Sequence, residues 1–366
     1  MTLVDIDAYA VATVNDGRLP FREDGAADRL AAAVEGGQVE ATTRAAAIGG
    51  AECVIVVVGT PIDAHLSPNV EAVPRVINDL ADHLVDGQLL VLRSTVHPGG
   101  TKLVERVLLR SGRDVDLAFC PERIAEGFAM TELFSLPQIV AARTERAAAR
   151  AEKLFRTLTE RIVPLSPEEA ELAKLFTNAW RYIKFAAANQ FWMLANDSGM
   201  DFDRIRNAIG DGYPRANDLP GAGFAAGPCL LKDTMQLAAF DNHAFVLGYS
   251  ALMVNESLPL YVVSRLERDH DLSTMSVGIL GMAFKGGSDD PRGSLAYKLR
   301  KLLAVRAAET LCSDPYVLDD RFVSTEELLR RADLAVIGAP HSEYRALATD
   351  KPVADIWGIT GRGVRI

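Results

Sequence analysis

Cysteine is scarce in this chain of 366 residues, which contains only four. They stand far apart, at positions 53, 120, 229 and 312, and no pair has the C-x-x-C spacing of zinc sites or redox motifs. The sparse cysteines therefore exclude a disulfide framework and a zinc knuckle, and we expect no metal site. A low count without pairing is typical of a reducing compartment, so we expect a cytoplasmic location.

Basic residues and long apolar runs are also in short supply. Lys and Arg number 39 against 49 Asp and Glu, which gives a formal net charge of -10. This sign is wrong for neutralising a phosphate backbone, so we expect no nucleic-acid partner. No segment has the ~18 consecutive apolar residues of a membrane span, and no basic stretch precedes an apolar run near the N-terminus. We therefore expect no membrane partner.

The composition is that of a folded protein with more than one domain. Hydrophobic residues make up 49% and charged residues 24%, which are ordinary globular proportions. At roughly 150 residues per domain, the length predicts two to three domains.

Strand and helix patterns alternate in the first third of the chain. Three short apolar runs predict strands at Cys53–Val58, Leu89–Leu92 and Leu117–Phe119. Between them, apolar residues recur every three to four positions over Val70–Leu84 and Thr101–Ser111, which predicts helices. Alternation of this kind predicts a parallel sheet covered by helices.

Each predicted strand is followed by polar loop residues. Thr60 and Pro61 follow the first strand, Thr95 follows the second, and Glu122 follows the third. Ligands bind beyond the carboxyl ends of the strands in open α/β sheets, so these loops are candidate sites by position.

The middle of the chain changes to long helical patterns, and the α/β alternation then returns. Helices are predicted within Ser166–Gly210 and from Leu237 to His270, and their aromatic residues suit a core or a subunit interface. The later predicted elements are strands at Val277–Leu280, Ala308–Cys312 and Leu334–Ile337 and helices at Ser294–Leu303 and Ser324–Arg331. The fold class is therefore α/β, with two Rossmann-like parallel-sheet domains joined by a long-helix region that offers a dimer surface.

A glycine-rich segment precedes Cys229. Its start, Gly221 to Ala226, matches the dinucleotide fingerprint G-x-G-x-x-A, but that motif needs a strand before it and a helix directly after it. Here Pro220 precedes the motif and Pro228 interrupts the chain beyond it. The segment is better explained as a flexible loop that approaches a ligand closely and presents the cysteine.

Cys229 and Asp233 have the spacing of one helical turn. A cysteine beside Lys232 near a helix start can have its thiolate stabilised by positive charge and free N–H groups, and can act as a nucleophile. A carboxylate on the same helix face can orient or deprotonate a water molecule. The alternative is a buried structural cysteine beside a solvated Lys–Asp pair.

Three further clusters are candidate sites. Lys174 and Asn178 share one helix face and could stabilise an oxyanion, or could be solvated surface residues. Glu122 and Glu126 could act as acid or base or bind ribose hydroxyls, or could serve as caps and ion pairs.

The last of these clusters follows a predicted strand of the C-terminal part. Phe284 and Lys285 come directly after it and Arg292 lies seven residues beyond Lys285, which suits an anionic ligand but is also common on protein surfaces.

Taken together, the ordered motifs resemble the UDP-glucose and UDP-N-acetylmannosamine dehydrogenase family of NAD-dependent nucleotide-sugar 6-dehydrogenases. The similarity covers nearly the whole chain. It rests on motifs that begin at Val4-Asp5-Ile6-Asp7, Asn15, Gly59-Thr60-Pro61, Ser94-Thr95-Val96, Cys120-Pro121-Glu122-Arg123, Lys174, Cys229 and Gly281.

The resemblance implies three parts and one reaction. The parts are an incomplete NAD-binding Rossmann domain at 1–165, a helical dimerisation region with the cysteine loop at 166–272, and a UDP-sugar-binding domain at 273–366. The reaction is a four-electron oxidation of a UDP-hexose, of the glucose or N-acetylhexosamine type, at C6 to the UDP-uronate. It runs through a thiohemiacetal and a thioester on Cys229, with NAD as cofactor and a homodimer as the expected assembly.

The resemblance also assigns residues to roles. The catalytic residues it implies are Cys229, Lys174, Asn178, Asp233, Thr95, Glu122 and Glu126. The cofactor-binding residues are Asp5, Thr60, Pro61, Thr95, Glu126, Lys232 and Arg292. The substrate-binding residues are Glu122, Arg123, Lys174, Asn178, Arg215, Gly223, Phe284 and Lys285.

One departure from the family concerns the cofactor. The family has a strand and a G-x-G-x-x-G turn about twenty residues before the ribose-binding acid, whereas Asp5 stands almost at the start here. We expect either a start upstream of Met1 or a relative that binds UDP-sugar without turnover, and we expect the first sheet to lack its central strand. A third class, the 6-phosphogluconate and 3-hydroxy-acid dehydrogenases, shares the architecture but has no use for a cysteine nucleophile.

Overall fold

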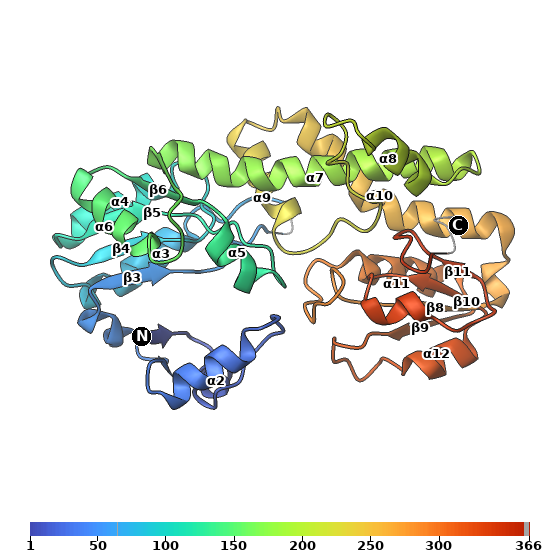
Figure 1. Cartoon of the computed structure of the whole chain (residues 1–366), viewed down its shortest axis with the longest axis horizontal. Helices are drawn as coiled ribbons and strands as arrows, with labels where there is room; N and C mark the ends of the chain where they lie inside the picture. The colour runs from blue at the N-terminus through green and yellow to red at the C-terminus, as the bar shows by residue number, and fades with distance from the viewer. Residues whose placement is uncertain (64, 362–365) are drawn as a thin grey trace. The chain divides into compact units, whose positions relative to one another are not determined.

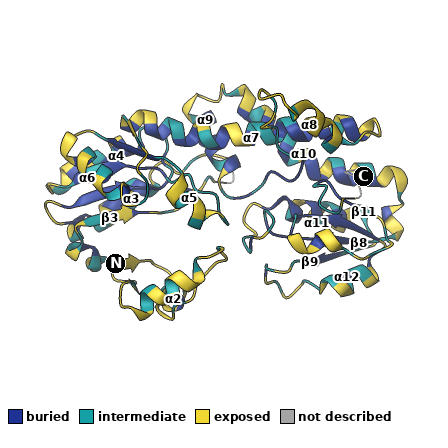
Figure 2. Ribbon diagram, viewed as in Figure 1, coloured by how far each residue is buried: buried dark blue, intermediate teal, exposed yellow. Residues whose placement is uncertain are grey.

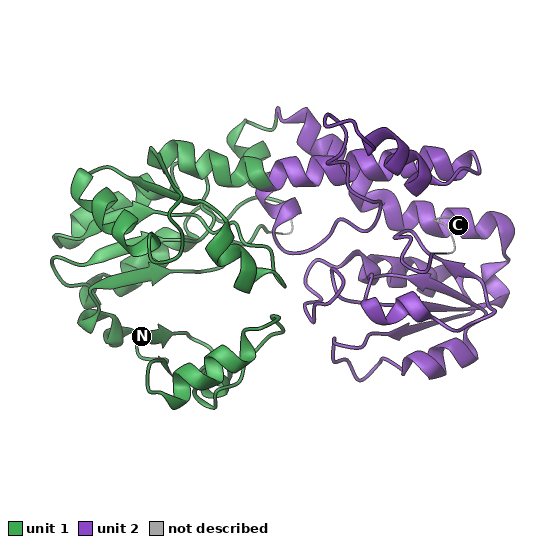
Figure 3. Cartoon of the chain, viewed as in Figure 1, with its two compact units in different colours: residues 1–177, 235–243 green, residues 178–234, 244–366 purple. Residues whose placement is uncertain are grey.

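A computed structural model describes residues 1–63, 65–361 and 366 and divides the chain into two compact units (Figures 1 and 3). Unit 1 comprises residues 1–177 and 235–243, and unit 2 comprises residues 178–234 and 244–366.

Unit 1 is built on a five-stranded sheet in the order β3-β4-β5-β6-β7. Its strands are β3 (Cys53–Val56), β4 (Leu89–Leu92), β5 (Asp116–Phe119), β6 (Gln138–Ala142) and β7 (Ile162–Leu165). Its main helices are α3 (Ala72–Leu80), α4 (Gly100–Ser111), α5 (Ala129–Ser135) and α6 (Glu145–Phe155), with 3-10 turns η1 (Ala45–Gly50) and η2 (Ala81–His83). The three strands predicted from apolar runs are all present and pair in parallel, β3 with β4 and β4 with β5.

The sheet of unit 1 is covered on both faces. Leu90 and Leu92 of β4 pack in one cluster with the apolar residues of α3 and α4, and Leu89 and Val91 pack in another with Phe155 of α6. All four β4 residues are buried. A strand buried on both faces needs a continuous apolar run, and this is why the sequence pattern located it.

One strand pair departs from the predicted parallel sheet. β5 and β6 run antiparallel, with Ala118 opposite Ala142 and Phe119 opposite Ala141. The connection between them holds only the short α5 and makes no helical crossover over the sheet. An antiparallel pair does not need such a crossover, whereas a parallel pair does.

The N-terminal strands form a sheet of their own, as the missing central strand predicts. β1 (Thr2–Val4) pairs in parallel with β2 (Glu40–Thr42), and among the described residues β3 pairs only with β4. Two helices, α1 (Ala8–Asn15) and α2 (Ala27–Glu35), connect β1 to β2. Ile55 of β3 and Val57 just beyond it are 47% and 72% exposed, so this face lacks the cover that the rest of the sheet has.

The helical middle of the chain differs from the prediction at one point. Its helices are α7 (Pro167–Asp197), α8 (Phe202–Gly210), α9 (Leu230–Phe240) and α10 (Val246–Asp269). The single helix predicted from Leu237 to His270 is therefore wrong, because the chain turns between α9 and α10. Asn242 and His243 adopt left-handed backbone angles there, with φ of 48° and 63°, which no α-helix can continue through.

Helix α10 is the one helix in the described part of the chain that is long and apolar enough to cross a bilayer. Leu258, Val262 and Val263 on its inner face are fully buried in the largest hydrophobic cluster of unit 2. It is therefore a core helix of this unit.

The C-terminal sheet of unit 2 has the order β11-β10-β8-β9 and is parallel throughout. Its strands are β8 (Ser276–Leu280), β9 (Glu309–Ser313), β10 (Leu334–Ile337) and β11 (Val353–Ala354), and its helices are α11 (Leu295–Arg306) and α12 (Thr325–Arg331), with η3 (Leu272–Thr274) and η4 (Ser342–Ala346). Strands β8 and β10 are buried along nearly their whole length (Figure 2). This confirms the second Rossmann-like domain.

Candidate active site

The loops that follow β3, β4 and β5 in unit 1 contact one another at the carboxyl edge of the sheet. The N–H of Val58 donates to Ser94 Oγ at 2.7 Å, and the N–H of Glu122 donates to the Arg93 carbonyl at 3.2 Å. The predicted residues Thr60, Thr95 and Glu122 belong to these connected loops. Parallel strand order thus gathers them at the ligand-binding edge that is usual for such sheets.

Glu122 orders its own loop. One carboxylate oxygen accepts from the N–H groups of Arg123 and Ile124 at 2.7 and 2.9 Å, and the other forms an ion pair with Arg93. Arg123 in turn donates to the Pro137 carbonyl. These contacts match the capping and ion-pair alternative, and a catalytic role for Glu122 stays a prediction.

A buried carboxylate that the sequence patterns did not single out holds the loop containing Thr95. Glu171 of α7 is 1% exposed and accepts from the N–H groups of Gly99 and Thr101 at 2.6 and 2.8 Å. It caps the first turn of α4 from a distance of about seventy residues in sequence, where the helix N-terminus favours negative charge. The signal in sequence is its place one turn before Lys174 on the same helix face.

Lys174 and Asn178 are buried side chains of α7, with exposures of 8% and 4%. The alternative of solvated surface residues is therefore wrong. Asn178 Nδ2 donates to Asp233 Oδ2 at 2.5 Å. This contact joins two residues that the sequence separates by 55 positions into one polar cluster of unit 2.

Cys229 is an exposed cysteine directly before α9. The N–H of Asp233 donates to the Cys229 carbonyl at 2.9 Å, which confirms the one-turn spacing of the two residues. Asp233 is fully buried, and Lys232 Nζ lies 2.8 Å from Asp233 Oδ1. The alternative of a buried cysteine beside a solvated Lys–Asp pair is wrong, because the cysteine is exposed and the aspartate is buried. A thiol at a helix start beside a buried, hydrogen-bonded carboxylate is suited to nucleophilic chemistry with an adjacent base.

The glycine-rich segment is a loop and has no strand before it, as its prolines indicate. Gly227 has φ of 101°, and a Cβ added there would lie 2.6 Å from the Phe284 ring. Glycine is therefore required at 227, because a side chain would displace Phe284. Lys285 Nζ lies 5.5 Å from the centre of the same ring, so Phe284 and Lys285 stand beside the cysteine loop within unit 2.

A buried Asp–His pair holds the loop that carries Phe284 and Lys285. Asp314 Oδ2 accepts from the N–H groups of Met282 and Ala283 at 2.6 and 3.0 Å and lies 3.1 Å from His341 Nε2. His341 Nδ1 accepts from the Gly287 N–H at 3.1 Å. Both side chains have no exposed surface, so the pair holds the loop on both sides of Lys285.

We predict that Asp314→Asn destabilises the protein by about 2 kcal/mol at pH 7. Burial alone would raise the pKa of Asp314, but hydrogen bonds from His341 and from the Val317 and Tyr316 N–H groups outweigh it and hold the pKa at about 2, below the ordinary 3.8. A lowered pKa contributes stability above about pH 4 that is lost as the pH falls towards 2. Urea unfolding should therefore show a gap between wild type and variant at pH 7 that narrows at pH 3. The exposed Asp320→Asn is the control, and an equal gap at both pH values would contradict the prediction.

The remaining predicted residues lie in both units. Asp5 directly follows β1 and is exposed, Thr60 is buried, Pro61 is exposed, and Glu126 is partly buried in the loop after β5. In unit 2, Arg292 forms an ion pair with Asp290, and Arg215 is exposed with its guanidinium 5.2 Å from the Tyr213 ring centre.

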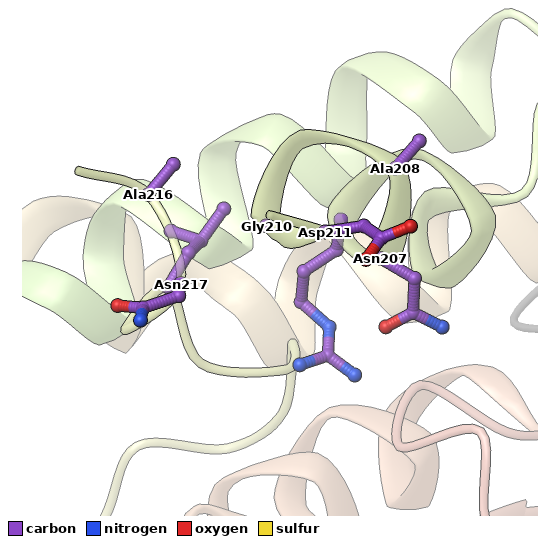
Figure 4. A pocket seen from close by; sticks show the side chains of 8 residues that line it. Asn207, Ala208, Gly210, Asp211, Ala216 and Asn217 are labelled. Carbon is purple, nitrogen blue, oxygen red and sulfur yellow. The ribbon is translucent and has the colours of Figure 1, made fainter. Parts of the chain in front are cut away.

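A polar cavity of about 520 Å³ lies beside α8 in unit 2. Asn207 of α8 lines it, together with Asp211 and Asn217 of the segment that follows this helix (Figure 4). It includes none of the predicted site residues, so it is separate from the cysteine loop chemistry. No group of three or more metal-ligating side chains exists within residues 1–63, 65–361 and 366.

The fold and the site define the class of protein. The chain has two Rossmann-like units. Connected loops lie at the edge of the first sheet, and a cysteine loop lies beside a buried carboxylate. These are the parts of a nucleotide-dependent oxidoreductase. Residues 1–159, 168–256 and 278–362 match the NAD binding, central and UDP binding domains of the UDP-glucose/GDP-mannose dehydrogenase family. The chain belongs to this family, which makes it an oxidoreductase with NAD as its cofactor and confirms the predicted resemblance and fold class.

Similar proteins cover nearly the whole chain. UDP-N-acetyl-D-mannosamine dehydrogenase of Pyrococcus horikoshii is 30% identical over 356 residues, which span 94% of this chain and 84% of that protein. The solved structure of the UDP-D-ManNAc dehydrogenase from the same organism has a TM-score of 0.90 at 28% identity and covers 98% of this chain and 90% of that one. A UDP-glucose dehydrogenase from Pyrobaculum islandicum also reaches 0.90 at 27% identity, over 100% of this chain and 90% of that one.

Proposed function

We propose that this chain oxidises the C6 alcohol of a UDP-hexose to the UDP-uronate in two steps, through a thiohemiacetal and a thioester on Cys229. The observation that carries the proposal is the exposed Cys229 at the start of α9, one turn from the buried Asp233 that Asn178 holds. The similarity to dehydrogenases of UDP-N-acetyl-D-mannosamine and UDP-glucose supports a UDP-hexose as the substrate class.

The protein residues divide the chemistry between them. The first oxidation yields the C6 aldehyde, and the Cys229 thiolate then adds to its carbonyl carbon to give a thiohemiacetal. The second oxidation gives a thioester, which water hydrolyses to the carboxylate and the free thiol. We assign Lys174 and Asn178 of α7 to the oxyanion that develops on C6, and Asp233 to the water that attacks the thioester. Thr95 stays a proposed catalytic residue of unit 1.

NAD, when bound, accepts the hydride of each oxidation. The residues that would hold it are Asp5 at the adenosine ribose, together with Thr60, Pro61, Thr95 and Glu126 in the loops beyond the sheet. The exposed Asp5 carboxylate at the end of β1 and the connected loops of unit 1 fit this cofactor. Lys232 and Arg292 remain proposed cofactor contacts. Glu122, Arg123, Arg215, Gly223, Phe284 and Lys285 are the proposed contacts of the sugar nucleotide.

The test is NADH formation followed by absorbance with a panel of UDP-sugars. Turnover of one sugar with two NADH formed per sugar would support the proposal and identify the hexose. One NADH per sugar, or no dependence on UDP-sugar, would overturn it.

A second candidate function has a specific observation in its favour. The two sheets of unit 1 are not hydrogen-bonded to each other in the described residues, so Asp5 and the loops after β3, β4 and β5 do not belong to one continuous sheet. A dinucleotide normally binds along the carboxyl edge of one such sheet. The candidate is a relative that binds UDP-sugar without turnover. Calorimetric titration with NAD and with UDP-sugar separates the two, because binding of UDP-sugar alone without NADH formation would favour the second.

We also propose the division into three functional domains at 1–165, 166–272 and 273–366, a homodimer, and a cytoplasmic location. The observation behind the dimer is a stripe on α7. Phe176, Trp180, Phe191 and Leu194 are between 49% and 61% exposed and lie within about 60° of one another around the helix. Exposed apolar stripes of this kind are typical of subunit interfaces.

We predict that Trp180→Glu weakens the dimer by at least tenfold in dissociation constant, because a carboxylate would replace a large aromatic contact inside the interface. Light scattering behind size-exclusion chromatography at several protein concentrations measures the effect. The control is Leu109→Glu on α4, which is 80% exposed and belongs to a different helix from the stripe. Monomeric wild-type protein, or equal masses for both variants, would contradict the prediction.

A further inference from the structure

The loop that carries Cys229 is buried although it has no regular structure. Ala222, Gly223, Phe224 and Ala225 are all buried, whereas Cys229 itself is exposed. Buried backbone N–H and C=O groups need hydrogen-bond partners, and a loop cannot obtain them from a strand or helix of its own. The groups that pair with this loop therefore decide where the thiol lies.

Asn189 of α7 pairs with Gly223 as a neighbouring strand would. The Gly223 N–H donates to Asn189 Oδ1 at 2.9 Å, and Asn189 Nδ2 donates back to the Gly223 carbonyl at 3.0 Å. One side chain amide thus satisfies both backbone groups of a residue 34 positions away. Asn189 has no exposed surface, so water does not compete for these bonds.

A second buried asparagine fixes the orientation of the first. Asn189 Nδ2 also donates to Asn255 Oδ1 at 2.9 Å, and Asn255 Nδ2 donates to the Tyr182 carbonyl at 3.2 Å. Asn255 lies on α10 and is likewise fully buried. Because its amide nitrogen is engaged with Tyr182, its oxygen faces Asn189, and this determines which end of the Asn189 amide meets which group of Gly223.

The other side of Gly223 is closed by an indole ring. A Cβ at Gly223 would lie 2.2 Å from ring carbons of Trp357, and Trp357 Nε1 donates to the Ile337 carbonyl at 3.1 Å. Gly223 is therefore held between Asn189 and a fixed aromatic ring. Cys229 follows six residues further along the chain, directly before α9.

We propose that Asn189, oriented by Asn255, is a positioning residue that sets the place of the Cys229 thiol through Gly223. The role rests on the proposed covalent function of Cys229. The hydrogen bonds between Asn189 and Gly223 do not depend on that function. An asparagine is required because the site needs one acceptor and one donor. An aspartate of the same shape would turn an oxygen towards the Gly223 carbonyl and leave that carbonyl without its donor.

The experiment compares Asn189→Ala and Asn189→Asp with Asn196→Ala in the full chain. Asn196 lies two turns further along α7, is 3% exposed, and bonds to Tyr261 instead of the cysteine loop, so its replacement removes an equally buried amide from the same helix. The first measurement is the rate at which iodoacetamide alkylates Cys229. Trypsin releases residues 216–232, in which Cys229 is the only cysteine, so mass spectrometry follows this thiol separately. The second measurement is hydrogen exchange of the same segment.

We expect both Asn189 variants to change the alkylation rate at least fivefold and to speed exchange in the loop, and Asn196→Ala to stay within twofold of wild type. Where the protein turns over UDP-sugar, kcat should fall about 100-fold, because a displaced nucleophile affects the chemical step. KM for the sugar nucleotide should rise by a smaller factor than kcat falls, because Gly223 is only one of its several proposed contacts. A failure of turnover in wild type would count against the proposed function and leave the alkylation result standing. Equal alkylation rates in the Asn189 and Asn196 variants would overturn the positioning role.

Asn255→Ala keeps the Asn189 side chain and removes only the group that orients it, so it serves where the Asn189 variants do not fold. We expect a smaller change in the alkylation rate, in the same direction. If circular dichroism shows that all three variants unfold while Asn196→Ala folds, the asparagine pair is a stability element and the positioning role is wrong.

Discussion

Replacing Cys229 with Ser should stop the reaction between its two oxidations and reduce uronate formation about 1000-fold or more. A serine hydroxyl at this position is a far weaker nucleophile than a thiolate, so the aldehyde cannot be converted to an acyl-enzyme at a useful rate. NADH formation should fall from two to at most one per sugar. Mass spectrometry of the sugar nucleotide should show the aldehyde or its hydrate in place of the uronate.

The matched control is Cys53→Ala, because Cys53 packs beside an apolar cluster in β3 and has no part in the proposed chemistry. It should leave NADH formation within twofold of wild type. Two NADH per sugar at the wild-type rate in Cys229→Ser would contradict the covalent route. That outcome would favour a second oxidation of the hydrated aldehyde, in which no bond to the enzyme forms.

The sequence predicted best those strands that are buried on both faces. Leu89–Leu92 and Leu334–Ile337 have the predicted bounds, because each is a continuous apolar run in the middle of a parallel sheet. The patterns did not reveal β6 or β7. The inner strand β6 contains only two β-branched residues, Ile139 and Val140, whereas β7 lies at the edge of the sheet and contains Pro164. Edge strands need less apolar sequence, and their pattern is correspondingly weak.

The sequence predicted those contacts of the candidate site that follow from spacing along one helix. It did not predict the contacts between segments that are distant in sequence. The distance of four between Cys229 and Asp233 places both on one turn, and the structure confirms this. Glu171 and Asn189 bond to backbone groups 72 and 34 positions away, and such contacts leave no periodic trace in sequence. The sequence signal that could have revealed them is a polar residue on the inner face of a predicted helix with no oppositely charged or hydrogen-bonding side chain one turn away.

The second large effect is expected from Arg93, which is buried beneath the loops of unit 1. Its side chain is 7% exposed, and it forms an ion pair with Glu122 and donates to the Cys120 carbonyl and to Gln138, both at 3.2 Å. Its guanidinium also lies 4.8 Å from the centre of the Phe155 ring. Four separate groups therefore depend on one cation.

Arg93→Met should lower the free energy of unfolding by about 3 kcal/mol, because it leaves the Glu122 carboxylate and two acceptors without their donor. The value lies at the low end of the range for buried pairs, since a third of the Glu122 side chain reaches solvent. The melting temperature of unit 1 should fall by about 6–12 °C. Differential scanning calorimetry and urea unfolding measure both quantities.

The double variant Arg93→Met, Glu122→Gln separates the lost ion pair from the lost packing. Removing both charges takes away the unpaired carboxylate, so the double variant should recover at least about 1 kcal/mol of the loss in the single variant. Glu122→Gln alone should destabilise less than Arg93→Met, because the amide oxygen of the new side chain still accepts from the N–H groups that Glu122 now binds at 2.7 and 2.9 Å. If the double variant is less stable than Arg93→Met, the buried cation acts mainly through the carbonyl of Cys120 and through Phe155, and the Glu122 loop is held by its backbone contacts.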